Sequence, residues 1–368
     1  MALGRRRVEE EEGEEVKTFA FTRVGAVLAV ALGAGCAGPT LQTGSVNAAA
    51  QQAEAAIQQE LSLRTSWEHQ RRVNRVARKL LEHNTDICAG ETKDTFGIVA
   101  LSIHGVKPNM REAARRAFGL GDAIALVDVP ETGPAYEAGL RNGDIIESVN
   151  DTPLPHGEQS LKTLAEVLAT PPGSKQFAVR RGAEQLSFDV TPRAACPVEV
   201  KVQENSVVNA YTDGKVVWVT RGMMNFARTD EELALVLGHE LAHVSLKHVE
   251  SKKGNMVLGA IFDVLLATQG INTQSLGAKT GAQAYSQEFE KEADYQGLYY
   301  VARAGYPVEN AAMFWRRMGV EHPSSIQASH SASHPSTPER FLGLTTNAEE
   351  IVRKRTAGLP LQPEKLEK

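Results

Sequence analysis

The stretch from Thr229 to Val244, TDEELALVLGHELAHV, decides the fold. It predicts a helix, because Thr229 and Glu232 form a capping-box pair and apolar residues then recur at helical spacing. Within it, His239-Glu240-Leu241-Ala242-His243 has the pattern HExxH. Two histidines four residues apart project from one helix face and can bind one Zn²⁺ together, while Glu240 faces the metal's water. The alternative is an exposed polar face, but the helix is apolar, and burying these groups is unfavourable unless a metal satisfies them.

A third metal ligand is expected from another segment, because catalytic zinc usually takes three protein ligands and leaves a fourth position for water. Residues 286–294, SQEFEKEAD, form a second predicted helix. Glu290 and Asp294 are four residues apart and share a face, so Glu290 can ligate while Asp294 accepts a hydrogen bond from a ligating histidine. On composition alone Glu288 and Glu292 compete for the ligand position. Without HExxH, the segment is typical of a solvated acidic helix.

Together these segments resemble the zinc metallopeptidases related to HtpX, BepA and the CAAX prenyl endopeptidase, peptidase family M48. Residues 209–223 resemble the strand pair ahead of the zinc helix, and residues 333–340, SHPSTPER, resemble the family's HP…ER segment. The resemblance implies that Glu290 is the third ligand of one Zn²⁺ per chain. It also implies an α+β fold: a mostly helical zincin-type metallopeptidase domain with a small β-sheet.

The chemistry expected of such a site is hydrolysis of peptide bonds. Zn²⁺ activates water and polarises the scissile carbonyl, and Glu240 acts as general base. The developing oxyanion needs a further donor, for which His334 and Arg340 are candidates. His334 lies in a Ser/Pro/His-rich stretch, and its other possible role is a latch over the metal's open position, as in related envelope peptidases. The strand at 216–220 is expected to offer an edge to an extended substrate.

A second domain interrupts the first. Residues 137–150, EAGLRNGDIIESVN, resemble the core signature of a PDZ domain. We expect an upstream strand at 124–129, a helix at 160–170 and a carboxylate-binding loop at 118–121. Such β-rich domains bind a C-terminal or extended peptide between a strand and a helix. A packing module without a ligand is the alternative, because the fold alone does not secure the function.

The N-terminus predicts export. Residues 24–35 are an apolar run that is too short to span a bilayer but suits a signal peptide, and small residues lead to Cys36 as in a bacterial lipoprotein cleavage site. Two features depart from that pattern: Gly33 stands where leucine is usual, and residues 9–15 are acidic. A translation start at Val16 would leave an ordinary basic segment. Ala37 after the cysteine implies the outer membrane, with a lipid-anchored, periplasm-facing protein.

Composition limits the remaining choices. With 368 residues, 42% of them hydrophobic, the chain can hold two globular domains, and a net charge of −5 without a basic stripe argues against nucleic-acid binding. Residues 256–268 are apolar but short, so we expect an amphipathic helix packed near the active site, with a lipid-facing role as the alternative. Lipidation of Cys36 leaves Cys88 and Cys196 as a predicted disulfide in an oxidising compartment.

The predicted organisation follows from these features. The segments are a signal peptide (1–36), a tether (37–60), the N-terminal helical part of the peptidase domain (61–110), the PDZ-like domain (111–195), the catalytic domain (196–345) and a C-terminal tail (346–368).

Two classes of function remain open. The first is a zinc endopeptidase of the bacterial cell envelope that hydrolyses misfolded or misassembled proteins. The second is a non-catalytic envelope scaffold or chaperone that binds peptides through the PDZ-like domain and uses zinc structurally. Glu240 favours the first class, because a structural site needs no general base and usually has a fourth Cys or His ligand.

Overall fold

The structure, a computed structural model, describes residues 40–88, 92–268, 274–275, 286–323, 334 and 337–365. Cys36 and the predicted signal peptide lie outside these residues. By its contacts the chain divides into two units, Met1–Ala53 and Glu54–Lys368. The described residues of the first unit are exposed. Among the residues that are described, no helix has both the length and the apolar character needed to cross a membrane.

Helix α2 (Ala48–Glu82) begins inside the segment 37–60, which we predicted to be a tether. That prediction was wrong for residues 48–60, which are rich in Ala, Gln and Glu and contain no Gly or Pro. Such a sequence propagates a helix once its other end is docked, because propagation is far easier than nucleation. The docked end carries Val76 and Leu80, which are fully buried in the peptidase core.

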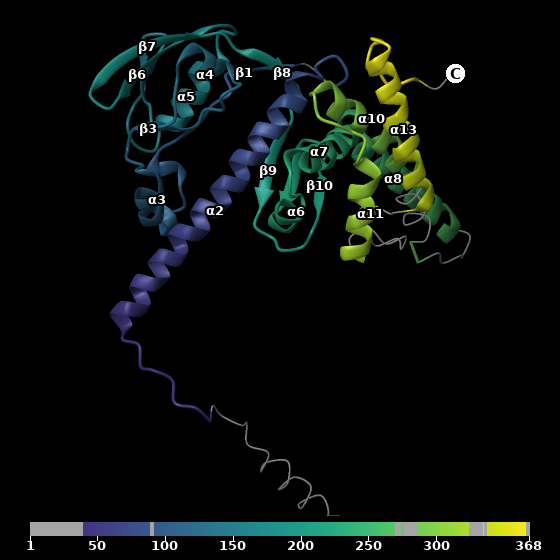
Figure 1. The fold of residues 1–368 in the computed structure, drawn as a ribbon, viewed down its shortest axis with the longest axis horizontal. Helices are drawn as coiled ribbons and strands as arrows, with labels where there is room; N and C mark the ends of the chain where they lie inside the picture. The colour runs from purple at the N-terminus through teal and green to yellow at the C-terminus, as the bar shows by residue number, and fades with distance from the viewer. Residues whose placement is uncertain are drawn as a thin grey trace, which may run out of the picture. The chain divides into compact units, whose positions relative to one another are not determined.

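The PDZ-like domain is built on an antiparallel sheet with the strand order β2-β3-β4-β6-β7, and β5 pairs with β4. Three helices accompany the sheet (Figure 1). The domain has its own apolar core. Its elements are β2 (Val99–Leu101), α3 (Arg111–Phe118), β3 (Ile124–Asp128), α4 (Pro134–Ala138), β4 (Ile145–Val149), β5 (Thr152–Pro153), α5 (Ser160–Ala169), β6 (Lys175–Arg181) and β7 (Glu184–Val190).

Two expectations for this domain need correction. The domain starts before residue 111, because β2 belongs to its sheet and Phe96 to its core. A three-residue strand is too short to show alternation, which is why the sequence did not reveal it. The predicted carboxylate-binding loop at 118–121 is mainly a helix end: Gly119 terminates α3 with a φ of 65°, a conformation suited to glycine.

The two stems of the insertion are joined twice. Strand β1 (Lys93–Thr95) pairs antiparallel with β8 (Arg193–Ala195), and a disulfide links Cys88 to Cys196. The structure therefore confirms the predicted cysteine pair. The polypeptide therefore leaves the expected peptidase domain and returns to it at one place, where the paired strands and the disulfide hold the two stems together.

The expected peptidase domain packs a three-stranded sheet and several helices against one side of the second half of α2 (Figure 1). Its elements are β9 (Glu199–Gln203), β10 (Ala210–Thr212), β11 (Val216–Thr220), α6 (Arg221–Phe226), α7 (Asp230–Ser245), α8 (His248–Thr268), α10 (Ser286–Arg303), α11 (Ala311–Glu321) and α13 (Pro338–Thr356). The chain is therefore α+β, as predicted.

The free edge of this sheet differs from the expected one. The strand order is β10-β11-β9, so β11, at residues 216–220, is paired on both sides. The outer edge of β9 contacts the Gln70 side chain on α2, which bonds to the backbone of Val200 and Val202. Among the strands that the structure describes, β10 is left as the open edge.

Two helices also depart from expectation. Helix α13 continues to Thr356 and buries Ala348 and Ile351, so the predicted tail from residue 346 is part of the folded domain up to that point. Helix α8 contains the apolar stretch 256–268, but most of the large apolar side chains described there, namely Met256, Val257, Leu258, Ile261, Val264 and Leu265, are exposed instead of packed near the site. A continuous apolar run does not say which side of a helix is covered.

Candidate metal centre

The HExxH helix α7 is capped and almost wholly buried. The Thr229 hydroxyl accepts a hydrogen bond from the Glu232 backbone N–H at 3.3 Å, as the capping box predicted. Every residue from Leu233 to Val244 is buried, including both histidines and Glu240. The polar groups of the motif therefore lie inside the domain and need partners there.

Helix α10 supplies those partners because it crosses α7 at two glycines. A side chain at Gly238 would meet the Gly297 carbonyl oxygen at 2.7 Å, and one at Gly297 would meet the His239 backbone nitrogen at 2.9 Å. The absence of side chains lets the two backbones touch. This close approach brings the acidic face of α10 to the histidines of α7.

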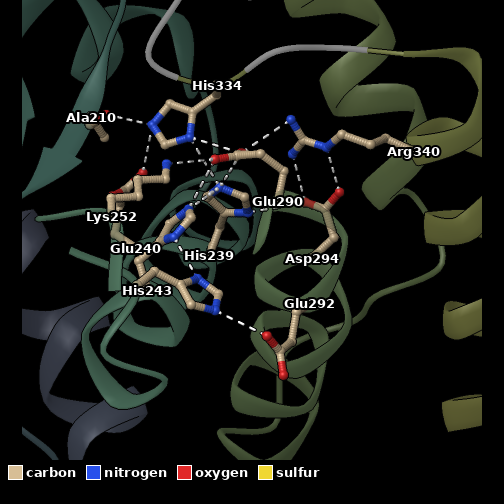
Figure 2. A network of polar contacts seen from close by, with 11 residues as sticks. Ala210, His239, Glu240, His243, Lys252, Glu290, Glu292, Asp294, His334 and Arg340 are labelled. Atoms are coloured by element: carbon tan, nitrogen blue, oxygen red, sulfur yellow. Dashed lines mark hydrogen bonds and ion pairs between the residues drawn. The ribbon is translucent and has the colours of Figure 1, made fainter. Parts of the chain in front are cut away.

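Four side chains converge on one point (Figure 2). His239, His243, Glu290 and His334 each offer a ligand atom, and all four atoms lie within 4.8 Å of one another. Nε2 of His239 is 3.2 Å from Oε2 of Glu290, and Nε2 of His243 is 3.4 Å from Oε1. Among the acidic residues of α10, Glu290 is buried, whereas Glu288 and Glu292 are exposed.

These residues fit a zinc ion. Three or four nitrogen and oxygen donors in a buried cluster are a typical zinc set. Two carboxylate oxygens, Oε1 of Glu290 and Oε2 of Glu240, are buried without a hydrogen-bond partner among the described residues. Buried acceptors are rarely left in that state, so a cation or ordered water is the expected partner.

Asp294 and Arg340 lie behind the ligands. Oδ1 of Asp294 is 2.9 Å from Nδ1 of His239, the ring nitrogen that faces away from the cluster. Arg340 donates two hydrogen bonds to Asp294, of 2.7 and 2.8 Å, and approaches Oε2 of Glu290 at 3.2 Å. Its guanidinium is thus occupied by two carboxylates.

His334 lies directly beside the expected ligands. Its Nδ1 is 3.0 Å from Oε2 of Glu290 and 3.2 Å from Nε2 of His239. Its Nε2 is 3.1 Å from the Ala210 carbonyl oxygen on β10 and 3.2 Å from Oε1 of Glu240. One imidazole therefore contacts a ligand set, the predicted base and the open edge of the sheet.

The charges of the cluster are strongly coupled. Burial raises the pKa of Glu290, but the charge of His334 and the neighbouring rings of His239 and His243 outweigh it and hold that pKa well below its usual value. Burial lowers the pKa of His334, but Glu290 and Glu240 raise it well above the usual value. Burial lowers the pKa of His243 to about 4, so this histidine is neutral, as a metal ligand must be.

Two residues near the centre were missed by the sequence reasoning. His248 begins α8, and its Nδ1 lies 2.9 Å from Nδ1 of His243. Lys252, one turn later, places its ammonium 3.9 Å from Oε1 of Glu290 (Figure 2). The position of His248, five residues after the second motif histidine, was the only signal available, and helical spacing alone would put it on another face.

Comparison with known proteins identifies both domains. Residues 178–348 match peptidase family M48, and residues 127–181 match the PDZ domain family. A mitochondrial metalloendopeptidase OMA1 of Arabidopsis thaliana is 32% identical over 39% of this chain. A putative beta-barrel assembly-enhancing protease of Vibrio cholerae is 28% identical over 31% of it, and the metalloprotease YcaL of Escherichia coli is 30% identical over 39%. The matched part amounts to 30%, 27% and 59% of those relatives, respectively.

Proposed function

We propose that this chain, which carries an M48 metallopeptidase domain and a PDZ domain, is a zinc-dependent endopeptidase of the bacterial cell envelope. The observation that carries the proposal is the buried cluster of His239, His243 and Glu290, with the carboxylate of Glu240 beside it. Misfolded or misassembled proteins are the proposed substrates. The bacterial relative named for beta-barrel assembly supports that choice.

His239, His243 and Glu290 would hold the zinc. When bound, zinc supplies a Lewis acid that activates water and polarises a peptide carbonyl. Glu240 would act as the general base, taking a proton from the attacking water and returning it to the leaving amine. Its Oε2, buried and without a partner among the described residues, is free to do so. Burial raises the pKa of Glu240, but His334 and the two motif histidines more than offset this, and the pKa stays below its usual value.

His334 is the proposed latch. It contacts Glu290, His239 and Glu240 at 3.0 to 3.2 Å, so it occupies space that water and substrate need. Its Nε2 also contacts the Ala210 carbonyl oxygen on β10. This strand is the open edge to which an extended substrate can add as a further strand. Substrate binding and withdrawal of His334 are therefore coupled.

Arg340 is proposed to position ligands, not to stabilise the oxyanion directly. Its guanidinium is committed to Asp294 and Glu290 and is buried. Asp294 in turn faces Nδ1 of His239, and such a partner fixes the tautomer and orientation of a ligand histidine.

The PDZ domain is proposed to bind an extended or C-terminal peptide along β2. This strand is at the end of the sheet, and α5 lies next to it: the hydroxyls of Ser102 and Ser160 are 3.3 Å apart. An edge strand beside a helix is the arrangement used for peptide addition in such domains. The PDZ domain would then present substrates to the peptidase domain.

Lipidation of Cys36 is the proposed means of membrane attachment, at the outer membrane. Intact-mass measurement of the mature protein tests it: we expect a lipid-sized mass increase that Cys36→Ser abolishes. Recovery of the wild-type protein from the soluble periplasmic fraction, without added mass, would contradict the anchor.

The decisive experiment measures zinc content together with degradation of an unfolded test protein. Glu240→Gln should retain zinc and lose activity by roughly 10²–10⁴-fold, because an amide cannot transfer the proton. Glu290→Ala should lose zinc, whereas the matched exposed control Glu288→Ala should not. If the wild type binds zinc but degrades nothing, and still binds peptides, the non-catalytic scaffold is the better description.

A further inference from the structure

His243 has a hydrogen-bond partner that begins a chain of contacts leading to solvent. Its Nε2 faces the metal cluster, 3.1 Å from Nε2 of His239. Its other ring nitrogen, Nδ1, lies 2.9 Å from Nδ1 of His248. Nε2 of His248 lies 3.1 Å from Oε2 of Glu292 on α10. His248 is only 2% exposed, whereas the side chain of Glu292 is 54% exposed.

Two features hold the ring of His248 in this position: a stacked aromatic side chain and the local course of the backbone. Phe289 on α10 stacks on it, with ring centroids 4.4 Å apart and an interplanar angle of 17°. The chain also breaks just before it: α7 ends at Ser245, Lys247 adopts a φ of 56°, and α8 starts at His248. A left-handed conformation is unfavourable for a side chain such as lysine, and strained positions of this kind persist where the surrounding structure enforces them.

The break has a specific geometric effect. In one continuous helix, residues five apart lie about 140° apart around the axis, since each residue turns by roughly 100°. His243 and His248 would then project in different directions. Turning the chain at Lys247 brings His248 back against the ligand.

Only one arrangement of protons satisfies both the His243–His248 and the His248–Glu292 hydrogen bonds while the two histidines stay neutral. Nε2 of His243 must keep its lone pair for the metal, so Nδ1 carries the proton and donates it to His248. Nδ1 of His248 is then an acceptor, and its Nε2–H donates to the Glu292 carboxylate.

We propose that His248 is a positioning residue that fixes the tautomer and ring orientation of the ligand His243, with Glu292 fixing His248 in turn. The two motif histidines are thus held differently: His239 directly by a buried carboxylate, His243 through a second imidazole. This inference rests on the proposed zinc site. His248 acts through His243, since the four-residue donor cluster found in the described part of the chain does not include it.

The test is zinc affinity of the purified full chain, measured by competition with a chelator. His248→Phe keeps the ring that stacks on Phe289 but removes both nitrogens, and should weaken zinc binding by about 10–100-fold. His248→Asn retains an acceptor near the position of Nδ1 and should recover part of that loss. Glu292→Ala should weaken binding less than His248→Phe, and the exposed control Glu288→Gln should leave it unchanged.

A second readout separates positioning from simple loss of packing. The visible absorption spectrum of the Co²⁺-loaded protein reports ligand geometry, and we expect it to change in His248→Phe while the thermal midpoint of the metal-free protein stays close to wild type. Wild-type zinc affinity in both His248→Phe and Glu292→Ala would overturn the inference and leave the zinc site intact. If His248→Phe does not fold, His248→Asn and Glu292→Ala decide: wild-type affinity in both overturns it. A wild type that binds no zinc would overturn the proposed function as well.

Discussion

Two aspartates, one in each domain, make almost the same ion pair for different reasons. In the PDZ domain, Asp144 accepts hydrogen bonds of 2.7 and 2.8 Å from Arg181. In the peptidase domain, Asp294 accepts hydrogen bonds of the same two lengths from Arg340. Both carboxylates are buried. Distance and burial alone therefore do not distinguish a structural pair from a functional one.

The surroundings of the two pairs differ. Asp144 also accepts from the backbone N–H of Arg141, and its arginine partner has 37% of its side chain exposed. Arg181 also donates to the Gly139 carbonyl oxygen at 2.8 Å, so this pair closes the turn ahead of β4 with local partners. Asp294 has a third neighbour, Nδ1 of His239, and its arginine also reaches Glu290. A buried pair that continues into a cluster with unsatisfied acceptors indicates a functional site, whereas a pair satisfied locally indicates a structural one.

The largest effect should come from the peptidase aspartate. Asp294→Asn removes the charge that orients His239, so zinc affinity should fall by about 10–100-fold, with a parallel loss of peptidase activity. Chelator competition on the purified protein measures it. Unchanged zinc affinity would mean that Asp294 only stabilises the fold, as Asp144 does in the PDZ domain.

The matched change in the PDZ domain should spare the metal site. Asp144→Asn should destabilise that domain by about 1–3 kcal/mol, because the guanidinium of Arg181 loses its charged partner and a buried site keeps a poorer hydrogen bond. Denaturant unfolding followed alongside zinc affinity checks both halves of the prediction. A fall in zinc affinity in the folded variant would show that the two domains are more closely coupled than the comparison implies.

The smallest effect concerns His334. If the latch is open for about 10% of the time, at the upper end of the usual range for a minor state, His334→Ala should raise the turnover of a short peptide by up to about tenfold. A fall of roughly 10²-fold would instead assign His334 to transition-state stabilisation. An identical rate in the variant and the wild type would remove this residue from the site despite its contacts with Glu290 and Glu240.

Much of the site could be predicted because its signals are local. Thr229, Glu232 and the apolar period mark one helix, and HExxH puts two histidines on one of its faces. The spacing of Glu290 and Asp294 places them on one face of a second helix, but it left Glu288 and Glu292 open as ligands. The resemblance to a family, not the spacing, selected Glu290. The crossing of α7 and α10 at Gly238 and Gly297 explains why that side chain is the buried one.

The sequence by itself determined the HExxH helix and its cap, because helical periodicity and capping patterns are properties of neighbouring residues. The two domains were expected from motifs that resemble known families, and the cysteine pair from a count of three cysteines with Cys36 set aside for lipid. The tertiary structure alone decided that β10 is the free edge, that Arg340 faces carboxylates and that His248 supports His243. Each of these depends on a pairing between distant segments or on a break in a helix. Sequence spacing does not encode such contacts, because packing of the whole domain selects them.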